Sequence, residues 1–291
     1  MNTDNIRFRS NRIRDIISLY HTELDAIYGA EVAVFVEMLC EAFLGWDRVR
    51  LLTGKEQTID QSDLLRFHWA LEDLKRHRPI QHIIGHTGFC GCRIEVNGNV
   101  LIPRPETEEM VNWTVESGGR KVERALDLCT GSGCIAIALK RAYPQAVVTA
   151  VDISPEALAV ARRNAEANGA EVRFVEADVL SDDFNCQSST FNLITANPPY
   201  VRESERNQMA PNVLEYDPAL ALFVPDDDPL RFYRAIARVA ARSLADDGLL
   251  VAEINEALAD ETCEVLKQCG LQPEVHTDFR GKARWVAARL E

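Results

Sequence analysis

The chain has 291 residues, which allows one large domain or two ordinary ones. Its composition, 46% hydrophobic and 26% charged, is typical of a globular protein with a real core and argues against a mainly disordered chain. With 45 acidic and 32 basic residues the net charge is −13, which disfavours a general nucleic-acid-binding protein.

The first 80 residues are expected to form a small helical bundle. Apolar residues at three- and four-residue intervals predict an amphipathic helix over residues 11–27, and an almost all-round apolar pattern predicts a buried helix over 30–43. A third helix is expected to begin at Ser62, a favourable N-cap, and to end before Pro79. This segment has 11 basic and 13 acidic residues, a net charge of 11 − 13 = −2, so most of the negative charge lies further along.

Residues 81–105 are expected to form a β-hairpin that connects two domains. Glycines punctuate this segment, and short stretches over 89–96 and 100–102 have strand character. The step Asn97-Gly98 lies between them, and both residues tolerate positive φ. We therefore expect the hairpin turn at this step.

Residues 106–291 have the alternation of strands and helices that a βαβ sheet requires. Helices are expected over 133–142, 155–168, 229–244 and 257–269. The last two strands are joined by a short loop, so they are expected to pair antiparallel. The candidate strands cover residues 125–129, 147–151, 172–176, 191–196, 249–254, 272–276 and 283–289.

Several classes of segment and site are not indicated. No run approaches the roughly 20 apolar residues that span a bilayer, and residues 1–15 lack the apolar stretch of a secretory signal. The eight cysteines contain no Cys-x-x-Cys pair, and His82 and His86, expected to be polar loop residues, have no evident third ligand. We therefore expect a cytoplasmic protein without a membrane segment or a metal site.

The first βα turn and the acid after the second strand favour an adenosine-type ligand. The first strand leads into Asp127-Leu128-Cys129-Thr130-Gly131-Ser132-Gly133, where glycines permit a sharp turn and close approach of a ligand. Asp152 ends the second strand, where a carboxylate can hold a ribose hydroxyl pair. The structural alternative is that Asp152 supports the cap of the helix that begins after Ser154. A nicotinamide-dependent enzyme and a methyltransferase both fit this pattern.

The segment Asn197-Pro198-Pro199-Tyr200, after the fourth strand, separates these two possibilities. Consecutive prolines fix the backbone and leave carbonyl groups free, while Asn and Tyr present an amide and an aromatic face. The Asn197 side-chain oxygen and the Pro198 carbonyl can accept both hydrogens of a planar NH2 group, and Tyr200 can stack on its plane. A rigid turn with a capping asparagine is the structural alternative, but this position in a βαβ pattern favours binding.

These segments resemble class I S-adenosylmethionine-dependent amino-methyltransferases. The run Leu101-Ile102-Pro103-Arg104-Pro105-Glu106-Thr107-Glu108, together with Pro79-Ile80-Gln81, Gly85 and Phe89 before it, is similar to the peptide chain release factor glutamine methyltransferases. The resemblance covers almost the whole chain. It implies a Rossmann-like seven-stranded methyltransferase sheet over 106–291, after a substrate-docking helical bundle over 1–80 and a hairpin connector over 81–105.

The resemblance also implies an activity and the residues for it. A methyl group would pass from S-adenosylmethionine to the amide nitrogen of the glutamine in the Gly-Gly-Gln loop of a release factor. Asn197 and Pro198 would orient that amide, with Pro199 and Tyr200 completing the substrate site and Asn197 also bordering the cofactor. For the cofactor, the resemblance implies Cys129, Thr130, Gly131, Ser132 and Gly133 at the methionine portion, Asp152 at the ribose, and Asp178 and Val179 at the adenine.

Two features depart from the family pattern. The family usually has glycine where this chain has Cys129, so a small side chain must fit beside the cofactor. Residues 201–230 carry seven acids and two arginines, a net charge of 2 − 7 = −5. This segment either covers the substrate, lies near a basic partner, or is a solvated loop.

The expected partner is a release factor, bound by a monomeric enzyme without direct nucleic-acid contact. A DNA or RNA amino-methyltransferase, acting on adenine N6 or guanine N2, shares the Asn-Pro-Pro-Tyr motif, but the acidic balance counts against it. A nicotinamide-dependent oxidoreductase would need a full Gly-x-Gly-x-x-Gly motif, and a non-catalytic binding protein would not need the intact motif set.

Overall fold

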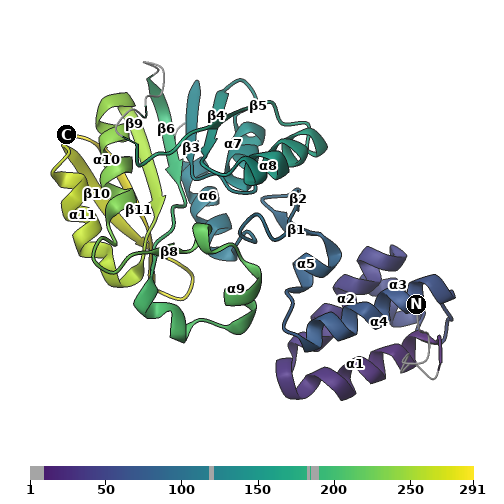
Figure 1. Ribbon diagram of the computed structural model, residues 1–291. Helices are drawn as coiled ribbons and strands as arrows, with labels where there is room; N and C mark the ends of the chain where they lie inside the picture. The colour runs from purple at the N-terminus through teal and green to yellow at the C-terminus, as the bar shows by residue number, and fades with distance from the viewer. Residues whose placement is uncertain (1–9, 118–120, 182–183, 185–189) are drawn as a thin grey trace. The chain divides into compact units, whose positions relative to one another are not determined.

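The computed structural model describes residues 10–117, 121–181, 184 and 190–291. The chain divides into two compact units, Met1–Gly85 and His86–Glu291. Figure 1 labels their helices and strands along the chain. The predicted hairpin segment, 81–105, is cut by this division: its first five residues belong to the first unit, and the strands of the hairpin belong to the second.

The first unit is a helical bundle, as predicted. It contains α1 (Ile13–Tyr28), α2 (Glu31–Leu44), α3 (Arg48–Thr53), α4 (Gln61–Lys75) and α5 (Ile80–Ile84), around a core that includes Tyr20, Leu39 and Phe67. The short helices α3 and α5 were not expected, because five or six residues show no helical period. His82 lies in α5 and is buried, so its expected place in a polar loop is wrong.

The predicted N-cap of the third long helix is also wrong. Asp60, not Ser62, caps α4: its carboxylate accepts a hydrogen bond from the Asp63 backbone N–H at 2.8 Å. The Ser62 hydroxyl instead donates to the same Asp60 carboxylate at 2.8 Å. Both residue types are good caps, and the helix begins at the earlier one because its carboxylate satisfies the first-turn amide.

The hairpin exists, but its turn does not lie at Asn97-Gly98. Strands β1 (His86–Phe89) and β2 (Cys92–Glu95) pair antiparallel and are joined by Cys90 and Gly91. These two residues have φ values of 46° and 70°, as a two-residue turn of the primed types requires. Asn97 lies beyond β2, where its carbonyl accepts from the Val100 N–H in a separate turn.

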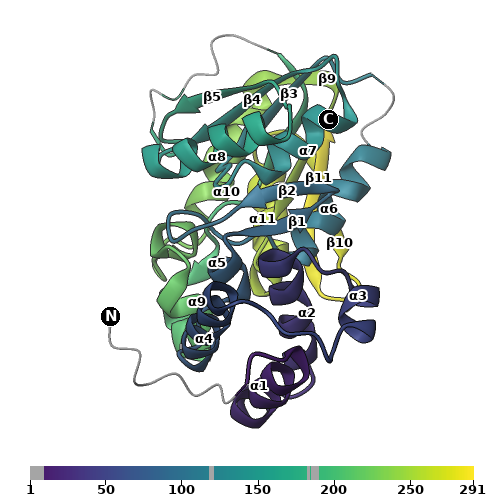
Figure 2. The ribbon, with the colours of Figure 1, turned by 90° about the vertical axis from the view of Figure 1, so that its right-hand side faces the viewer.

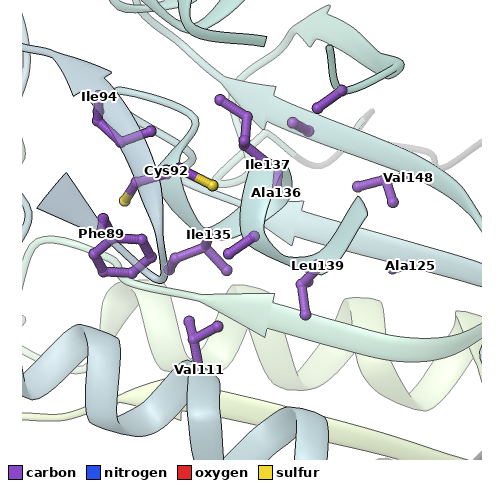
Figure 3. Close-up of a cluster of buried hydrophobic side chains, with 14 of the residues drawn as sticks. Phe89, Cys92, Ile94, Val111, Ala125, Ile135, Ala136, Ile137, Leu139 and Val148 are labelled. Carbon is purple, nitrogen blue, oxygen red and sulfur yellow. The ribbon is translucent and has the colours of Figure 1, made fainter. Parts of the chain in front are cut away.

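Two asparagines of α8 (Pro155–Ala167) and its C-cap hold the hairpin on the second unit. Asn164 accepts from the Glu95 N–H at 2.6 Å and donates to the carbonyls of Glu95 and Ser132 at 3.0 and 2.9 Å. One helical turn later Asn168 makes the same pair of bonds with Arg93, at 3.2 and 2.8 Å. Figure 3 shows Phe89, Cys92 and Ile94 of the hairpin gathered with Ile135 and Ile137 of α7 (Cys134–Ala142). The hairpin is thus part of the core of this unit.

We expect Asn164→Ala to lower the free energy of unfolding of the second unit by about 3 kcal/mol, because it leaves the buried Ser132 carbonyl and two partly buried backbone groups of Glu95 without partners. Asn168→Ala is the matched control and is expected to cost about 1 kcal/mol, because water can reach the Arg93 groups that it leaves behind. Urea unfolding of the two variants measures the difference. Equal losses of unfolding free energy would show that Asn164 does not stabilise the hairpin more than Asn168 does.

Within the described residues the second unit has a seven-stranded sheet in the order β10-β11-β9-β6-β3-β4-β5. Strand β11 runs antiparallel to both of its neighbours, β9 and β10, and the other pairs are parallel. All of the strands predicted for this sheet and the antiparallel C-terminal pair are confirmed, whereas the strand predicted over residues 100–102 is wrong, because the hairpin already turns at Cys90 and Gly91. The strands are β3 (Arg124–Leu128), β4 (Val147–Asp152), β5 (Val172–Glu176), β6 (Phe191–Ala196), β9 (Leu244–Glu253), β10 (Leu271–Thr277) and β11 (Ala283–Leu290).

Helices cover both faces of this sheet. On one face lie α6 (Pro105–Ser117), α7 and α8 together with the hairpin, and on the other lie α10 (Arg231–Ser243) and α11 (Ala259–Lys267) (Figures 1 and 2). The strand order reverses between β3 and β6, so the carboxyl ends of β3, β4 and β6 meet at a topological switch point. Open α/β sheets bind ligands at such a point.

The segment after β6 is structured. It contains β7 (Val201–Arg202), α9 (Pro211–Tyr216) and β8 (Phe223–Val224), and β7 and β8 pair with each other in parallel. Among the described residues no helix has both the length and the hydropathy needed to cross a bilayer.

Candidate active site

A cavity of about 620 Å³ lies at the switch point of the second unit. Loops after β3, β4, β5 and β6 line it, together with residues of the stretches 98–107 and 218–232. Of the predicted site residues it is lined by residues 129–132, Asp152, Asp178, Val179, Asn197 and Pro199. Gly133, Pro198 and Tyr200 are not among the residues that line it. The structure therefore brings residues from four separate turns to one cavity.

The glycine loop after β3 requires left-handed backbone at three alternate positions. The φ values are 58° at Cys129, 52° at Gly131 and 79° at Gly133. Side chains other than glycine adopt this region at a cost, which explains why glycine suits the Cys129 position. Burial, and then the neighbouring Asp152, Asp127 and Asp178, raise the pKa of the Cys129 thiol well above its ordinary value. This environment favours the neutral thiol of Cys129 in the cavity wall.

Asp127 holds the glycine loop in place through hydrogen bonds. Its carboxylate is fully buried and accepts hydrogen bonds from the hydroxyls of Thr130 in the loop and Thr195 on β6, the latter at 2.8 Å. Burial raises the pKa of Asp127 to about 7, although the two hydroxyls oppose the shift. These contacts lock the loop to two adjacent strands.

Asp152 links the glycine loop to the start of α8, so the predicted support of the helix cap is observed. One carboxylate oxygen accepts from the Gly131 N–H at 2.8 Å, and the other accepts from the Ser154 N–H at 3.0 Å. Ser154 in turn caps α8 by accepting from the Ala157 N–H at 3.1 Å. Each carboxylate oxygen has a second lone pair, so Asp152 can also accept from a ligand diol in the cavity that it lines.

The loop after β5 supplies another wall. Asp178 accepts from the Leu180 N–H at 2.8 Å, which closes a tight turn around Val179. Val179 is buried yet borders the cavity, so it presents an apolar surface suited to a flat ring.

Asn197 is held by a residue from another element. Its side-chain nitrogen donates to the Thr107 hydroxyl oxygen on α6 at 3.4 Å, and the Thr107 hydroxyl donates to Glu253, at the end of β9, at 2.9 Å. Burial, and then Glu253, raise the pKa of the Tyr200 phenol. The Tyr200 carbonyl accepts from the Asn255 side chain at 3.0 Å.

Sequence reasoning missed the residues that support the motif. Thr107 and Arg104 entered only through the resemblance, and Glu253 and Asp217 were not proposed. Arg104 borders the cavity and forms an ion pair with the buried carboxylate of Asp217. A usable signal for Glu253 is an acid that directly follows the apolar run over residues 249–252 at the carboxyl end of its strand.

The acidic segment 201–230 forms a wall of the cavity. Two of its acids are paired locally: Glu205 with Arg202 and Asp226 with the Ser204 hydroxyl. Leu220 and Phe223, in contrast, line the cavity. The segment is therefore not a purely solvated loop. Its residues would contact a ligand that occupies the cavity.

Comparison with known proteins shows the family and the fold of this chain. Residues 22–85 match the PrmC N-terminal domain and residues 111–217 match the methyltransferase small domain. A methyltransferase structure from Pyrococcus furiosus, with a TM-score of 0.50 and 20% identity, covers 68% of this chain and 88% of its own, and it shares the fold.

Relatives with a curated description extend over nearly the whole chain. A release factor glutamine methyltransferase of Flavobacterium psychrophilum is 44% identical over 262 residues, which is 88% of this chain and 91% of the relative. One of Bacteroides thetaiotaomicron is 40% identical over 275 residues, 94% of this chain and 98% of the relative. The resemblance seen in the sequence is thereby confirmed, and the chain belongs to the release factor glutamine methyltransferase family.

Proposed function

We propose that this chain methylates the side-chain amide nitrogen of the glutamine in the Gly-Gly-Gln loop of peptide chain release factors, with S-adenosylmethionine as methyl donor. The observation that carries this proposal is the position of Asn197, which borders the same cavity as the glycine loop and Asp152. An amide-orienting side chain and a cradle for a nucleoside-type cofactor thus share one space.

The residues present fit S-adenosylmethionine. The loop over residues 129–133 would hold the methionine portion, Asp152 the ribose hydroxyls, and Asp178 and Val179 the adenine. The spare lone pairs of Asp152 and the apolar surface of Val179 support these assignments. When bound, S-adenosylmethionine supplies an electrophilic methyl group on a positively charged sulfur.

The chemical difficulty is the acceptor, because an amide nitrogen shares its lone pair with the carbonyl. The Asn197 side-chain oxygen and the Pro198 carbonyl would accept both amide hydrogens, which enriches the nitrogen and aims it at the methyl group. As the carbon–nitrogen bond forms and the sulfur–carbon bond breaks, the nitrogen becomes acidic and its extra proton leaves to water. Tyr200 would hold the amide plane, and no strong base is needed before transfer.

A nucleic-acid substrate fits less well. The net charge is −13, and the segment 201–230, which carries a net charge of 2 − 7 = −5, contributes Leu220 and Phe223 to the cavity wall. A phosphate backbone would approach this wall against unfavourable charge. We therefore infer a protein substrate and no direct contact with nucleic acid.

We also infer that the first unit docks the release factor, because it is a separate bundle with its own core and matches the PrmC N-terminal domain over residues 22–85. We further propose that the enzyme is monomeric. Free thiols such as Cys40 and Cys92 suit the reducing cytoplasm, where release factors act.

The test uses the purified chain with methyl-labelled S-adenosylmethionine. We expect labelling of a full-length release factor, none of its Gln→Ala loop variant, and weaker labelling of a short Gly-Gly-Gln peptide that lacks the docking contacts. Equal labelling of the loop variant, or labelling of DNA or RNA instead, would exclude the proposed function. A peptide labelled as efficiently as the factor would exclude the docking role of the first unit.

A further inference from the structure

A buried chain of hydrogen bonds leads from Asn197 into the core of the second unit. The Asn197 amide nitrogen contacts the Thr107 hydroxyl oxygen at 3.4 Å, and this hydroxyl contacts a Glu253 carboxylate oxygen at 2.9 Å. The side chains come from the end of β6, from α6 and from the end of β9, and Thr107 and Glu253 are each 2% exposed. We call this arrangement the amide relay.

The order of donors and acceptors in the amide relay fixes which way the Asn197 amide points. The two ends of an amide have the same shape, so its partners decide its orientation. The Thr107 hydroxyl has a single hydrogen, and an ionised Glu253 can only accept. Once Thr107 donates to Glu253, its oxygen can only accept, so the Asn197 nitrogen faces Thr107 and the Asn197 oxygen remains for a ligand.

We propose that Thr107 and Glu253 are positioning residues that keep the Asn197 oxygen directed at the substrate amide. This inference rests on the proposed function. If the Asn197 amide turned over, it would present its own NH2 group to the substrate NH2 group, and two donors would meet. Thr107 and Glu253 therefore act on the rate of transfer through the orientation of Asn197.

The ionisation state of Glu253 controls the amide relay. Burial raises the pKa of Glu253 to about 7, against the opposing effects of the Thr107 hydroxyl and of Arg284 and Arg104. Glu106 on α6 raises the pKa of Glu253 further, and the phenols of Tyr200 and Tyr233 face the same carboxylate. A protonated Glu253 can donate to Thr107, which frees the hydroxyl hydrogen to attract the Asn197 oxygen. Activity is thus expected in the ionised state, above this pKa, and is lost as pH falls through it.

The first test is Thr107→Val, which keeps the shape and removes the hydroxyl. We expect kcat for release factor methylation to fall at least about tenfold, with S-adenosylmethionine affinity and KM close to wild type. Thr107→Ser restores the hydroxyl and is expected to recover most of the rate. The matched control is Thr114→Val on the same helix, because the Thr114 hydroxyl is equally buried but donates to the Met110 carbonyl at 2.7 Å. Thr114→Val is expected to leave kcat unchanged.

The second test is the pH profile of kcat. Wild type is expected to lose activity as pH falls through about 7, and Glu253→Gln, which cannot ionise, is expected to lose this limb. Burial also raises the pKa of Asp127 to about 7, so an unchanged limb in Glu253→Gln would assign the limb to another group such as Asp127 and overturn the role of Glu253.

The outcomes separate this inference from the proposed function. A wild-type chain that does not label the release factor overturns the proposed function and the relay together. An active wild type with a Thr107→Val variant of equal kcat overturns the relay alone. A Thr107→Val variant that loses S-adenosylmethionine affinity as well, or a Thr107→Ser variant no better than Thr107→Val, assigns Thr107 a structural role instead.

Discussion

Asn197→Ala is expected to lower kcat for release factor methylation by about 100-fold and to leave the affinity for S-adenosylmethionine close to wild type. The methyl group of alanine cannot accept a hydrogen from the substrate amide, and correct orientation of a reacting group is worth about this factor. The cofactor cradle is held by other contacts, since Asp127 fixes Thr130 and Asp152 fixes Gly131. The site should therefore bind its cofactor and fail to aim the substrate.

Saturating kinetics together with calorimetric titration of S-adenosylmethionine separate these two effects. Asn192→Ala is the control on the same strand, because Asn192 accepts from the backbone N–H groups of Glu123 and Arg124 at 3.0 and 3.1 Å and does not line the cavity. It is expected to change stability and not kcat. An Asn197→Ala chain with normal turnover at saturation and weak cofactor binding would place Asn197 at the cofactor alone.

The sheet is predictable because each of its strands is a short apolar run between turn residues. The β5 and β6 bounds are reproduced without error, since their ends coincide with changes in hydropathy. The hairpin turn is not predictable by the same means. Asn97-Gly98 has the sequence preference for positive φ, whereas Cys90, with a φ of 46°, adopts it because Phe89 and Cys92 pair across the turn. Pairing in the fold overrides the local preference.

The residues of the site likewise divide into those that the local sequence predicts and those that depend on contacts between distant elements. Residues 129–132 and Asp152, which line the cavity, are predictable from the sequence. They lie at the ends of strands, and the residue types at these neighbouring positions indicate a ligand site. Thr107 and Glu253 are 146 positions apart, and neither has a local pattern that indicates the hydrogen bond between them. Only the placement of α6 beside the end of β9 makes them partners. The spacing of residues along the chain does not predict contacts between a motif and side chains of distant elements.

Gly133→Ala is expected to be the most damaging change in the glycine loop. Gly133 has a φ of 79°, and an added Cβ would lie 3.0 Å from the Ala161 Cβ and 3.3 Å from its Cα on α8. The left-handed conformation costs an alanine roughly 1 kcal/mol, and crowding against a packed helix adds about 1–3 kcal/mol. Because α8 is also tied to the loop through Asn164 and Ser132, a shift of the helix should distort the cofactor cradle as well.

Gly131→Ala is the matched control, since it separates backbone strain from crowding. Gly131 has a similar φ of 52°, but nothing lies within 4 Å of an added Cβ. Urea unfolding should therefore show a loss of about 1 kcal/mol for Gly131→Ala and about two to four times that loss for Gly133→Ala. Titration of S-adenosylmethionine into Gly133→Ala should show weakened binding at temperatures where the variant remains folded. Equal losses of stability would mean that α8 moves to accommodate the added methyl group. Backbone strain alone would then explain the loss caused by each substitution.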